Sequence, residues 1–387
     1  MGKRLGILTG GGDVPGLNAC IRMLVEQAHA RGWRTLGFRR GWAGPLSIDV
    51  SDLEASSAAH IMALEPALVR TIDRAGGTML HTSRVDPRCL KPDERAAYPA
   101  LADARANDGG GFDATPHILK VLDALGIDVM VTMGGDGTLR YSAHLSRLGV
   151  PVVTIPKTMD NDVFGTDYCI GFSTAVSRSV EAITALRTTV SSHERIGVIE
   201  LFGRRSGETA LMAGYLSQVD RVVISEVPVA PDRLADLLAE DRARNAQSYA
   251  MMVVSEGAHL AGEAGAKDIA MSASTRASVG IGRRLSDHIR ARTGQGTVLQ
   301  ELAYLMRSGA PDALDKMVGM AFGTLAIQLI EAGRDGVMTA VVDGNYEAVD
   351  AQLVAQGCKM VDVKALYDPH AYRPKIAAIL HKPMFLY

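Results

Sequence analysis

Cysteine is scarce in this chain, and the few cysteines are not grouped. Cys20, Cys89, Cys169 and Cys358 lie far apart in the 387 residues, with no CxxC pair among them. Structural zinc sites use closely spaced cysteines, and disulfide frameworks are typical of much shorter secreted chains. The sequence therefore argues against both a zinc site and a disulfide framework.

An excess of charge of one sign and long apolar runs are also missing. The 41 Lys and Arg against 43 Asp and Glu give a formal net charge of −2, which provides no whole-chain attraction to nucleic acid or to an anionic membrane. No stretch approaches the roughly 20 unbroken apolar residues that span a bilayer. The opening "MGKRLGILTGGGD" has no signal-peptide pattern. We therefore expect a cytoplasmic protein without nucleic-acid or membrane partners.

What the chain does contain is a series of short apolar runs that end in Gly, Asp or Ser. These runs are 4–13, 129–138, 151–158, 195–204, 249–257 and 337–344. Continuous runs of this kind are typical of strands buried on both faces of a parallel sheet. Helical patterns fall between them, at 17–32, 115–126, 174–189 and 316–333. The alternation predicts right-handed βαβ units in an α/β fold. By contrast, 86–116 has no strand signal and indicates a surface excursion or a flexible lid.

Two glycine-rich loops follow predicted strands, where open α/β sheets bind their ligands. In "TGGGDVPGLN" (9–18), the glycines would let backbone N–H groups approach a phosphate. In "GGDGT" (134–138), Asp136 stands where it could hold a divalent cation such as Mg²⁺. The alternatives are a tight strand–helix turn for the first loop and an Asp-Gly turn for the second.

A third polar segment, "PKTMDND" (156–162), follows the next predicted strand. One of Asp160 and Asp162 could accept a proton and the other could make an electrostatic or metal contact, while Lys157 could bind a phosphate. Downstream, Arg195 and Arg204 bracket another strand, and Glu256 ends a further one in "SEGAH". The alternatives are a capped loop and solvated charges.

Taken together, these stretches resemble the phosphofructokinase family. The resemblance is carried by "GILTGGGDVPGLNACIR", "MGGDGT", "PKTMDND…GTDYCIGFSTA", "SSHERIGVIELFGR" and "SEGAH", in the family's order over roughly residues 4–340. A GGDGT loop also occurs in NAD kinases and lipid kinases. Its combination with "PKTMDND" and the "GR" downstream is far more specific.

The resemblance implies two Rossmann-like α/β lobes, each with a mainly parallel sheet between helices, and an active site in the interlobe cleft. Residues 1–171 plus 306–356 would bind the phosphoryl donor, and 172–305 plus 357–387 would bind the sugar phosphate. The implied reaction is Mg²⁺-dependent phosphoryl transfer to the 1-hydroxyl of fructose 6-phosphate, a step of glycolysis.

The resemblance also implies residue roles by position. Asp160 would be the base, with Thr158 and Arg204 assisting, and Asp136 and Asp162 would serve the metal. The positions implied for the donor are Gly12, Arg84, Gly135, Gly137, Thr138 and Lys157. The positions implied for the sugar are Thr158, Asp160, Asp162, Phe202, Gly203, Arg204, Glu256, Tyr304 and Arg307. Arg195 would reach the 6-phosphate from a neighbouring subunit, which implies a homodimer or homotetramer.

Two departures from the family pattern bear on specificity. Pyrophosphate-dependent members typically carry Asp at the position of Gly137 and Lys at the position of Lys157. This chain has the glycine of the ATP type, which leaves room for the α-phosphate, and the lysine of the other type. We therefore expect ATP, with pyrophosphate as the alternative donor. In "TVLQELAYLMRSG" (297–309), Val298 and Tyr304 replace a phosphate-binding Arg and His, and only Arg307 remains. Another sugar phosphate or a polyol therefore stays an alternative acceptor.

Other readings explain less of the sequence. An NAD-kinase-like enzyme accounts for "GGDGT" but not for "PKTMDND". A catalytically silent sugar-phosphate sensor would have no use for a base, so the presence of Asp136 and Asp160 argues against it. Bacterial allosteric relatives carry a second effector-binding Arg near Arg22, where this chain has Glu26. We therefore expect no strong activation by nucleoside diphosphates.

Overall fold

The computed structural model describes residues 2–98, 100–101, 104–107, 110–263 and 280–375. The chain divides into two compact units. Unit 1 comprises Met1–Thr158, Val163–Gly171 and Ser308–Gly357, and unit 2 comprises Met159–Asp162, Phe172–Arg307 and Cys358–Tyr387.

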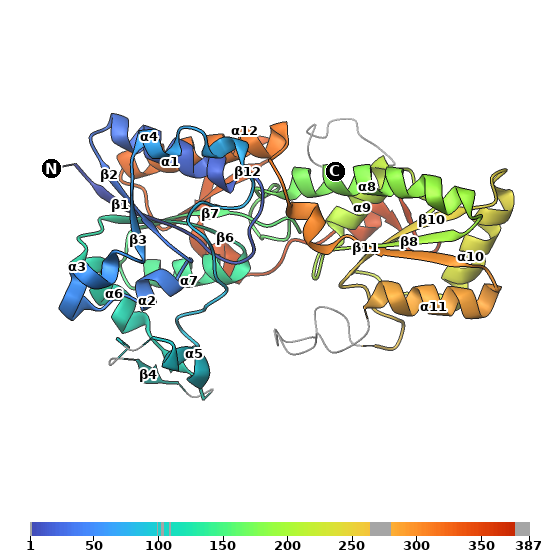
Figure 1. The fold of residues 1–387 in the computed structure, drawn as a ribbon, viewed down its shortest axis with the longest axis horizontal. Coiled ribbons are helices and arrows are strands. Elements are labelled where there is room, and N and C mark those ends of the chain that lie inside the picture. Colours follow the sequence, from blue (N-terminus) through green and yellow to red (C-terminus); the bar gives the residue numbers. More distant parts are fainter. Residues whose placement is uncertain (1, 99, 102–103, 108–109, 264–279, 376–387) are drawn as a thin grey trace. The chain divides into compact units, whose positions relative to one another are not determined.

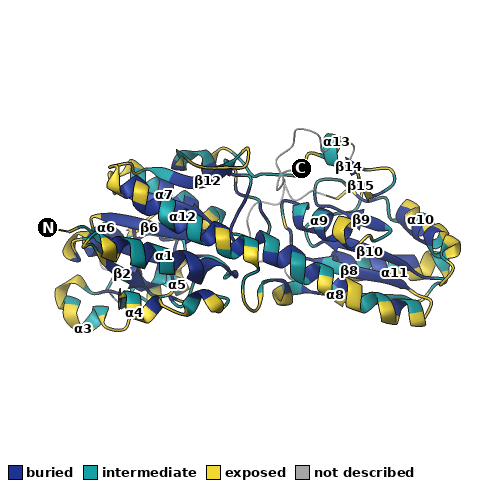
Figure 2. Ribbon diagram, turned by 90° about the horizontal axis from the view of Figure 1, so that it is seen from above, coloured by how far each residue is buried: buried dark blue, intermediate teal, exposed yellow. Residues whose placement is uncertain are grey.

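Unit 1 is built on a mainly parallel sheet (Figure 1). Within the described residues it has seven strands in the order β13-β12-β7-β6-β1-β2-β3, of which the edge strands β3 and β13 are antiparallel to their neighbours. The strands are β1 (Arg4–Thr9), β2 (Arg34–Phe38), β3 (Ile61–Leu64), β6 (Val129–Gly134), β7 (Val152–Pro156), β12 (Val337–Val342) and β13 (Asn345–Asp350). Every residue of β6 is buried (Figure 2), and so is every residue of β7, as the continuous apolar runs predicted.

Helices cover both faces of this sheet (Figure 1). One face carries α1 (Leu17–Ala30), α4 (Pro66–Val69) and α12 (Ala313–Glu331); the other carries α2 (Ala43–Leu46), α3 (Leu53–Ser57), α6 (Thr115–Ala124) and α7 (Asp136–Arg147). On the first face, α1 and α12 approach closely because glycine leaves room. A Cβ on Gly319 would lie 2.7 Å from the Gly16 carbonyl oxygen, and one on Gly323 would lie 2.8 Å from that of Cys20.

By length and composition, α12 is apolar enough to cross a membrane, with a mean hydropathy of 1.3. Its buried residues include Val318, Phe322 and Ile327, which pack inside unit 1. Asp315 interrupts its apolar run and is fully buried, accepting hydrogen bonds from the Tyr168 hydroxyl and the Gly171 amide, both at 2.7 Å. Its contacts are those of a core helix.

The segment 86–116 is more ordered than the sequence predicted. It contains α5 (Pro92–Ala96) and a short hairpin of β4 (Arg105–Ala106) and β5 (Phe112–Asp113). Its Leu90 and Leu101 are buried in the cluster that includes Trp42 and Tyr141. The absence of a strand signal was therefore misleading for the described part, which pairs two short strands and is anchored by a few buried apolar residues.

Unit 2 has a second parallel sheet, of four strands in the described part, in the order β11-β8-β10-β9. The strands are β8 (Ile196–Leu201), β9 (Arg221–Val223), β10 (Ala250–Ser255) and β11 (Thr297–Glu301). On one face lie α8 (Phe172–Ser192) and α9 (Glu208–Leu216), and on the other α10 (Pro231–Arg244) and α11 (Ile281–Thr293) (Figure 1). The sequence did not predict α9, α10, α11, β9 or β11. A short helix, α13 (Val363–Leu366), precedes the hairpin of β14 (Tyr367–Asp368) and β15 (Arg373–Pro374).

Candidate active site

Three of the predicted loops meet at one edge of the unit 1 sheet. Because β7, β6 and β1 are parallel neighbours, the loops that follow them lie side by side. The Lys157 amide donates to the Gly134 carbonyl and the Gly10 amide donates to the Met133 carbonyl, both at 2.9 Å. The structure therefore brings together the loops that carry Gly12, Gly135, Asp136, Gly137, Thr138, Lys157 and Thr158.

Thr138 explains two of the loop glycines. A Cβ on Gly10 would lie 2.3 Å from the Thr138 Oγ1, and a Cβ on Gly134 would lie 2.3 Å from the Thr138 Cβ. A larger residue at either position would displace Thr138, which is buried. Gly137 is different, because a Cβ there would meet no heavy atom of the described residues within 4 Å. The space beside Gly137 is open.

Lys157 reaches from its own loop to the first glycine loop. Its side chain is buried, and its Nζ donates to the Gly12 carbonyl at 2.5 Å. A Cβ on Gly11 would lie 3.2 Å from the same Nζ. The ammonium group therefore places a positive charge among backbone groups of the glycine loop, where a phosphate could be neutralised.

Asp136 is the first residue of α7 and has a basic partner. The Arg140 Nε donates to the Asp136 Oδ1 at 2.7 Å, and both side chains are partly exposed. A carboxylate in the first turn of a helix is stabilised by the helix dipole. Asp136, which was predicted to hold a metal, therefore forms an ion pair with Arg140. This pair was not predicted from the sequence, although the i,i+4 spacing could have indicated it.

Arg84 belongs to a segment that packs on the glycine loop. The Gly11 amide donates to the Ser83 carbonyl at 2.8 Å, and the Thr82 Oγ1 donates to the Gly11 carbonyl at 2.7 Å. Arg84 comes next and is exposed. The backbone next to Arg84 is therefore held beside the first glycine loop, and the contact of Arg84 with a phosphoryl donor stays a prediction.

The carboxylates of "PKTMDND" lie in unit 2, in the loop Met159–Asp162, which we call the aspartate loop. The pKa of Asp160 is raised to about 7, first because burial removes water from the carboxyl group and then because Asp162 and Glu256 place negative charge beside it. The positive charge and the backbone amide of Arg204 act in the opposite direction. The structure therefore brings Asp160, Asp162, Arg204 and Glu256 together.

Arg204 and Glu256 also contact each other, with the Arg204 Nε donating to the Glu256 Oε1 at 3.2 Å. Between β8 and Arg204, Gly203 has a φ of +142°, which favours glycine. A Cβ on Gly203 would lie 2.6 Å from the Ser255 Oγ, which donates to the Gly203 carbonyl at 2.5 Å. Glycine is therefore required for the turn that presents Arg204.

Phe202, Tyr304 and Arg307 form a second group in unit 2. The Phe202 and Tyr304 rings pack edge to face with centroids 5.6 Å apart, and the Arg307 guanidinium lies 4.8 Å from the centre of the Tyr304 ring. Tyr304 is 58% exposed. This group therefore presents an exposed aromatic ring with a cation against it, and its contacts with the sugar stay a prediction.

Arg195 and Val298 lie at the other end of the unit 2 sheet. Arg195 precedes β8, whereas Phe202 follows it, so about 20 Å of strand separates them at about 3.3 Å per residue. Val298 pairs with Gly197, near the amino end of β8. Arg195 is exposed, and the structure does not bring it together with Arg204 in the same chain.

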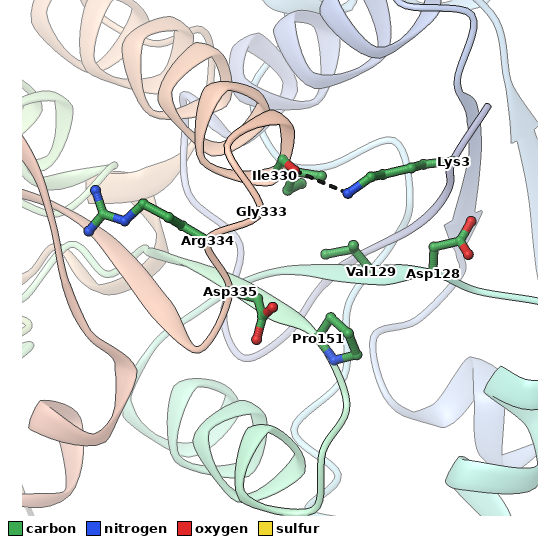
Figure 3. Close-up of a pocket in the computed structure, with 8 residues that line it drawn as sticks. All are labelled: Lys3, Asp128, Val129, Pro151, Ile330, Gly333, Arg334 and Asp335. Carbon is green, nitrogen blue, oxygen red and sulfur yellow. Dashed lines mark hydrogen bonds between the residues drawn. The ribbon is translucent and has the colours of Figure 1, made fainter. Parts of the chain in front are cut away.

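One cavity of unit 1 lies apart from these loops (Figure 3). It has a volume of about 280 Å³ and is lined by Lys3, Asp128, Val129, Pro151, Ile330, Gly333, Arg334 and Asp335. Val129 begins β6 and Pro151 precedes β7, so the cavity is at the amino edge of the sheet. The Lys3 Nζ donates to the Ile330 carbonyl at 3.1 Å. None of the predicted site residues lines this cavity.

Comparison with known proteins identifies the family of this chain. A family model described as phosphofructokinase matches residues 4–330. The chain belongs to the phosphofructokinase family. An ATP-dependent 6-phosphofructokinase 1 of Thermus thermophilus is 34% identical over 89% of this chain and 91% of the relative. A pyrophosphate–fructose 6-phosphate 1-phosphotransferase of Thermoproteus tenax is 36% identical, also over 89% of this chain and 91% of the relative.

Solved phosphofructokinases share the fold. A pyrophosphate-dependent phosphofructokinase from Nitrosospira multiformis superposes with a TM-score of 0.76 at 17% identity, over 97% of this chain and 89% of that chain. The family assignment confirms the predicted resemblance, the α/β fold and the kind of enzyme. Because phosphofructokinases named for either donor have similar identity to this chain, the comparisons do not separate ATP from pyrophosphate.

Proposed function

We propose that this protein transfers a phosphoryl group from ATP to the 1-hydroxyl of fructose 6-phosphate, giving fructose 1,6-bisphosphate. The observation that carries the proposal is the position of Asp160 in a member of the phosphofructokinase family. It is a partly buried carboxyl group with a pKa raised to about 7 beside Arg204 and Glu256. A base with a pKa near the working pH is suited to accept the proton of a hydroxyl group.

In the proposed step, the Asp160 carboxylate takes the proton of the sugar hydroxyl as that oxygen forms its bond to the γ-phosphorus. The bond between the γ-phosphorus and the bridging oxygen breaks, and ADP leaves with that oxygen. Arg204 provides positive charge near Asp160, and Thr158 directly precedes the aspartate loop. Positioning and charge neutralisation are the main requirements of phosphoryl transfer.

The donor is assigned to the loops of unit 1. Backbone N–H groups of the loop around Gly12, the amino end of α7 and the buried Lys157 ammonium are suited to bind a polyphosphate. The open space beside Gly137 supports ATP, because an α-phosphate needs room there. Lys157 is the feature that keeps pyrophosphate as the alternative donor.

Asp136 and Asp162 are the residues that would serve Mg²⁺, which neutralises phosphate charge in phosphoryl transfer. Their carboxylate oxygens fit this ion, since Mg²⁺ prefers oxygen ligands and usually takes one or two carboxylates plus phosphates and waters. Among the described residues, no three His, Cys, Asp or Glu side chains form a group that could hold a metal. In the proposal, substrate phosphates and water provide the remaining ligands of the ion.

The residues predicted to bind the 6-phosphate leave more than one acceptor substrate open. Tyr304 and Val298 replace phosphate-binding residues of the family, and Arg307 lies against the Tyr304 ring. A second acceptor, another sugar phosphate or a free polyol, is therefore kept as an alternative. Strong preference for fructose 6-phosphate, lost in Arg307→Ala, would exclude that alternative.

Arg195 supports an oligomer in the proposed function. It lies at the end of β8 opposite to Phe202, so it cannot join Arg204 within one chain. If Arg195 binds the 6-phosphate, it does so from a second subunit of a homodimer or homotetramer. We also propose that the enzyme works in the cytoplasm.

The test is a matrix of donors and acceptors with the purified protein. ATP and pyrophosphate are each combined with fructose 6-phosphate, sedoheptulose 7-phosphate and free polyols, with Mg²⁺ present. We expect ATP with fructose 6-phosphate to give the highest kcat/KM. Asp160→Asn should keep sugar-phosphate binding and lose nearly all turnover. A protein that binds sugar phosphates but shows no turnover with any pair would instead support the sensor.

A further inference from the structure

The aspartate loop is held by side chains that no sequence motif indicated. Asn161 is fully buried and has a φ of +52°, a left-handed conformation that Asn tolerates better than most residues. Its Nδ2 donates to the Glu208 Oε1 at 3.0 Å. This hydrogen bond joins the residue between Asp160 and Asp162 to the first residue of α9.

Glu208 is in turn paired with Lys359, 151 residues further along the chain. The Lys359 Nζ lies 2.9 Å from the Glu208 Oε2 and donates to the Glu208 Oε1 at 3.2 Å. Both side chains are about one-fifth exposed. The carboxylate that accepts from Asn161 is thus oriented by a partly buried ammonium group.

The backbone on either side of Asn161 is held by the same two segments. The Thr209 Oγ1, next to Glu208, donates to the Met159 carbonyl at 2.8 Å. The Lys359 amide donates to the Asp162 carbonyl at 3.0 Å, and the neighbouring Cys358 Sγ lies 3.3 Å from the same oxygen. Hydrogen bonds therefore fix the backbone at both ends of the aspartate loop.

A further carboxylate joins the two supporting segments to each other. Glu226 accepts from the Gly207 amide at 3.0 Å and from the Val361 amide at 2.9 Å. Gly207 directly precedes α9, and Val361 lies two residues beyond Lys359. The segment around Lys359 and the start of α9 therefore form one hydrogen-bonded support under the aspartate loop.

We propose that Asn161, Glu208 and Lys359 are positioning residues for the reaction: they hold the aspartate loop in the left-handed turn that aims the Asp160 and Asp162 carboxylates. This inference rests on the proposed function. Lys359 acts through Glu208, and Glu208 acts through Asn161. Because the triad supports the aspartate loop, whereas the donor loops belong to unit 1, its loss should lower kcat by a larger factor than it raises the KM for the donor.

The experiment compares variants of the full-length protein with ATP and fructose 6-phosphate. Lys359→Met removes the ammonium group, and a displacement of the base by about 1 Å should lower kcat by about 10- to 100-fold. Lys359→Arg keeps a cation for Glu208 and should restore most of the loss. The matched control is Arg292→Met, which breaks the Arg292–Asp236 ion pair between α11 and α10, with contacts of 2.7 and 2.8 Å. It should leave kcat unchanged.

A double variant tests the order of action. If Lys359 acts through Glu208, then Lys359→Met combined with Glu208→Gln should have the kcat of the worse single variant rather than the product of both losses. The thermal unfolding of each variant is also measured. A variant that unfolds at the wild-type temperature but has a lower kcat is folded, and its loss of activity is then due to the displaced loop.

Two results overturn different claims. An active wild-type enzyme whose folded Lys359→Met and Glu208→Gln variants keep the wild-type kcat would refute the positioning role alone. A wild-type protein that is inert with every donor and acceptor would refute the proposed function itself.

Discussion

Gly137 offers a direct test of the donor, because a side chain there has room. We predict that Gly137→Asp lowers kcat/KM for ATP without unfolding the protein. Position 137 lies in the first turn of α7, and a Cβ there would meet no heavy atom of the described residues within 4 Å. Replacing a glycine inside a helix raises the free energy of unfolding by up to about 1 kcal/mol. Repulsion between the new carboxylate and Asp136 lowers it. The free energy of unfolding should therefore change by less than about 1 kcal/mol.

The loss of activity follows from the charge. A carboxylate about 4 Å from the α-phosphate costs about 1 kcal/mol if water screens it and about 4 kcal/mol at an effective dielectric constant of 20. A middle value of about 2 kcal/mol lowers kcat/KM for ATP by about 30-fold. Pyrophosphate has no third phosphate to repel, so its kcat/KM should be affected much less.

The assay measures initial rates with each donor for the wild type, Gly137→Asp and two controls. Gly137→Asn has nearly the shape of Asp without its charge, and Gly137→Ala adds only a Cβ. Both should keep most of the ATP activity. If Gly137→Asp is folded and keeps the wild-type kcat/KM for ATP, Gly137 does not face the donor and the argument for ATP fails.

Two further predictions concern pH and regulation. Because Asp160 must be deprotonated to accept a proton and its pKa is raised to about 7, turnover should fall as the pH is lowered through that region. In Glu256→Gln, which removes a neighbouring negative charge, the same fall should occur at lower pH; an unchanged profile would contradict the role of Asp160. The Arg22 Nη1 donates to the buried Asp73 at 3.0 Å and its Nε donates to Glu26 at 2.8 Å, so this guanidinium already has two carboxylate partners. The rate should therefore depend hyperbolically on fructose 6-phosphate with or without ADP, and a sigmoidal curve relieved by ADP would refute this.

Much of the fold could be predicted from local pattern. The run "VMVTMG" predicted β6 because an unbroken apolar stretch of strand length is stable when both faces of the strand are covered. The glycines after β1 and β6 marked places where the backbone must come close to other groups. The segment 86–116 was misjudged because its anchors, such as Leu90 and Leu101, are single apolar residues among charges and have no period.

The sequence by itself determined the order of strands and loops, the family, and the residue types at the candidate site, because these depend on neighbours along the chain. Only the tertiary structure decided which distant groups meet. Lys157 reaches Gly12 across 145 residues, and Lys359 reaches Glu208 across 151. The raised pKa of Asp160 likewise comes from burial, from Asp162 and from Glu256, which directly follows β10 and is 96 residues away in the sequence. Such contacts depend on which elements pack together in the folded chain. The local periodicity of the sequence predicts single helices and strands and does not indicate which distant elements meet.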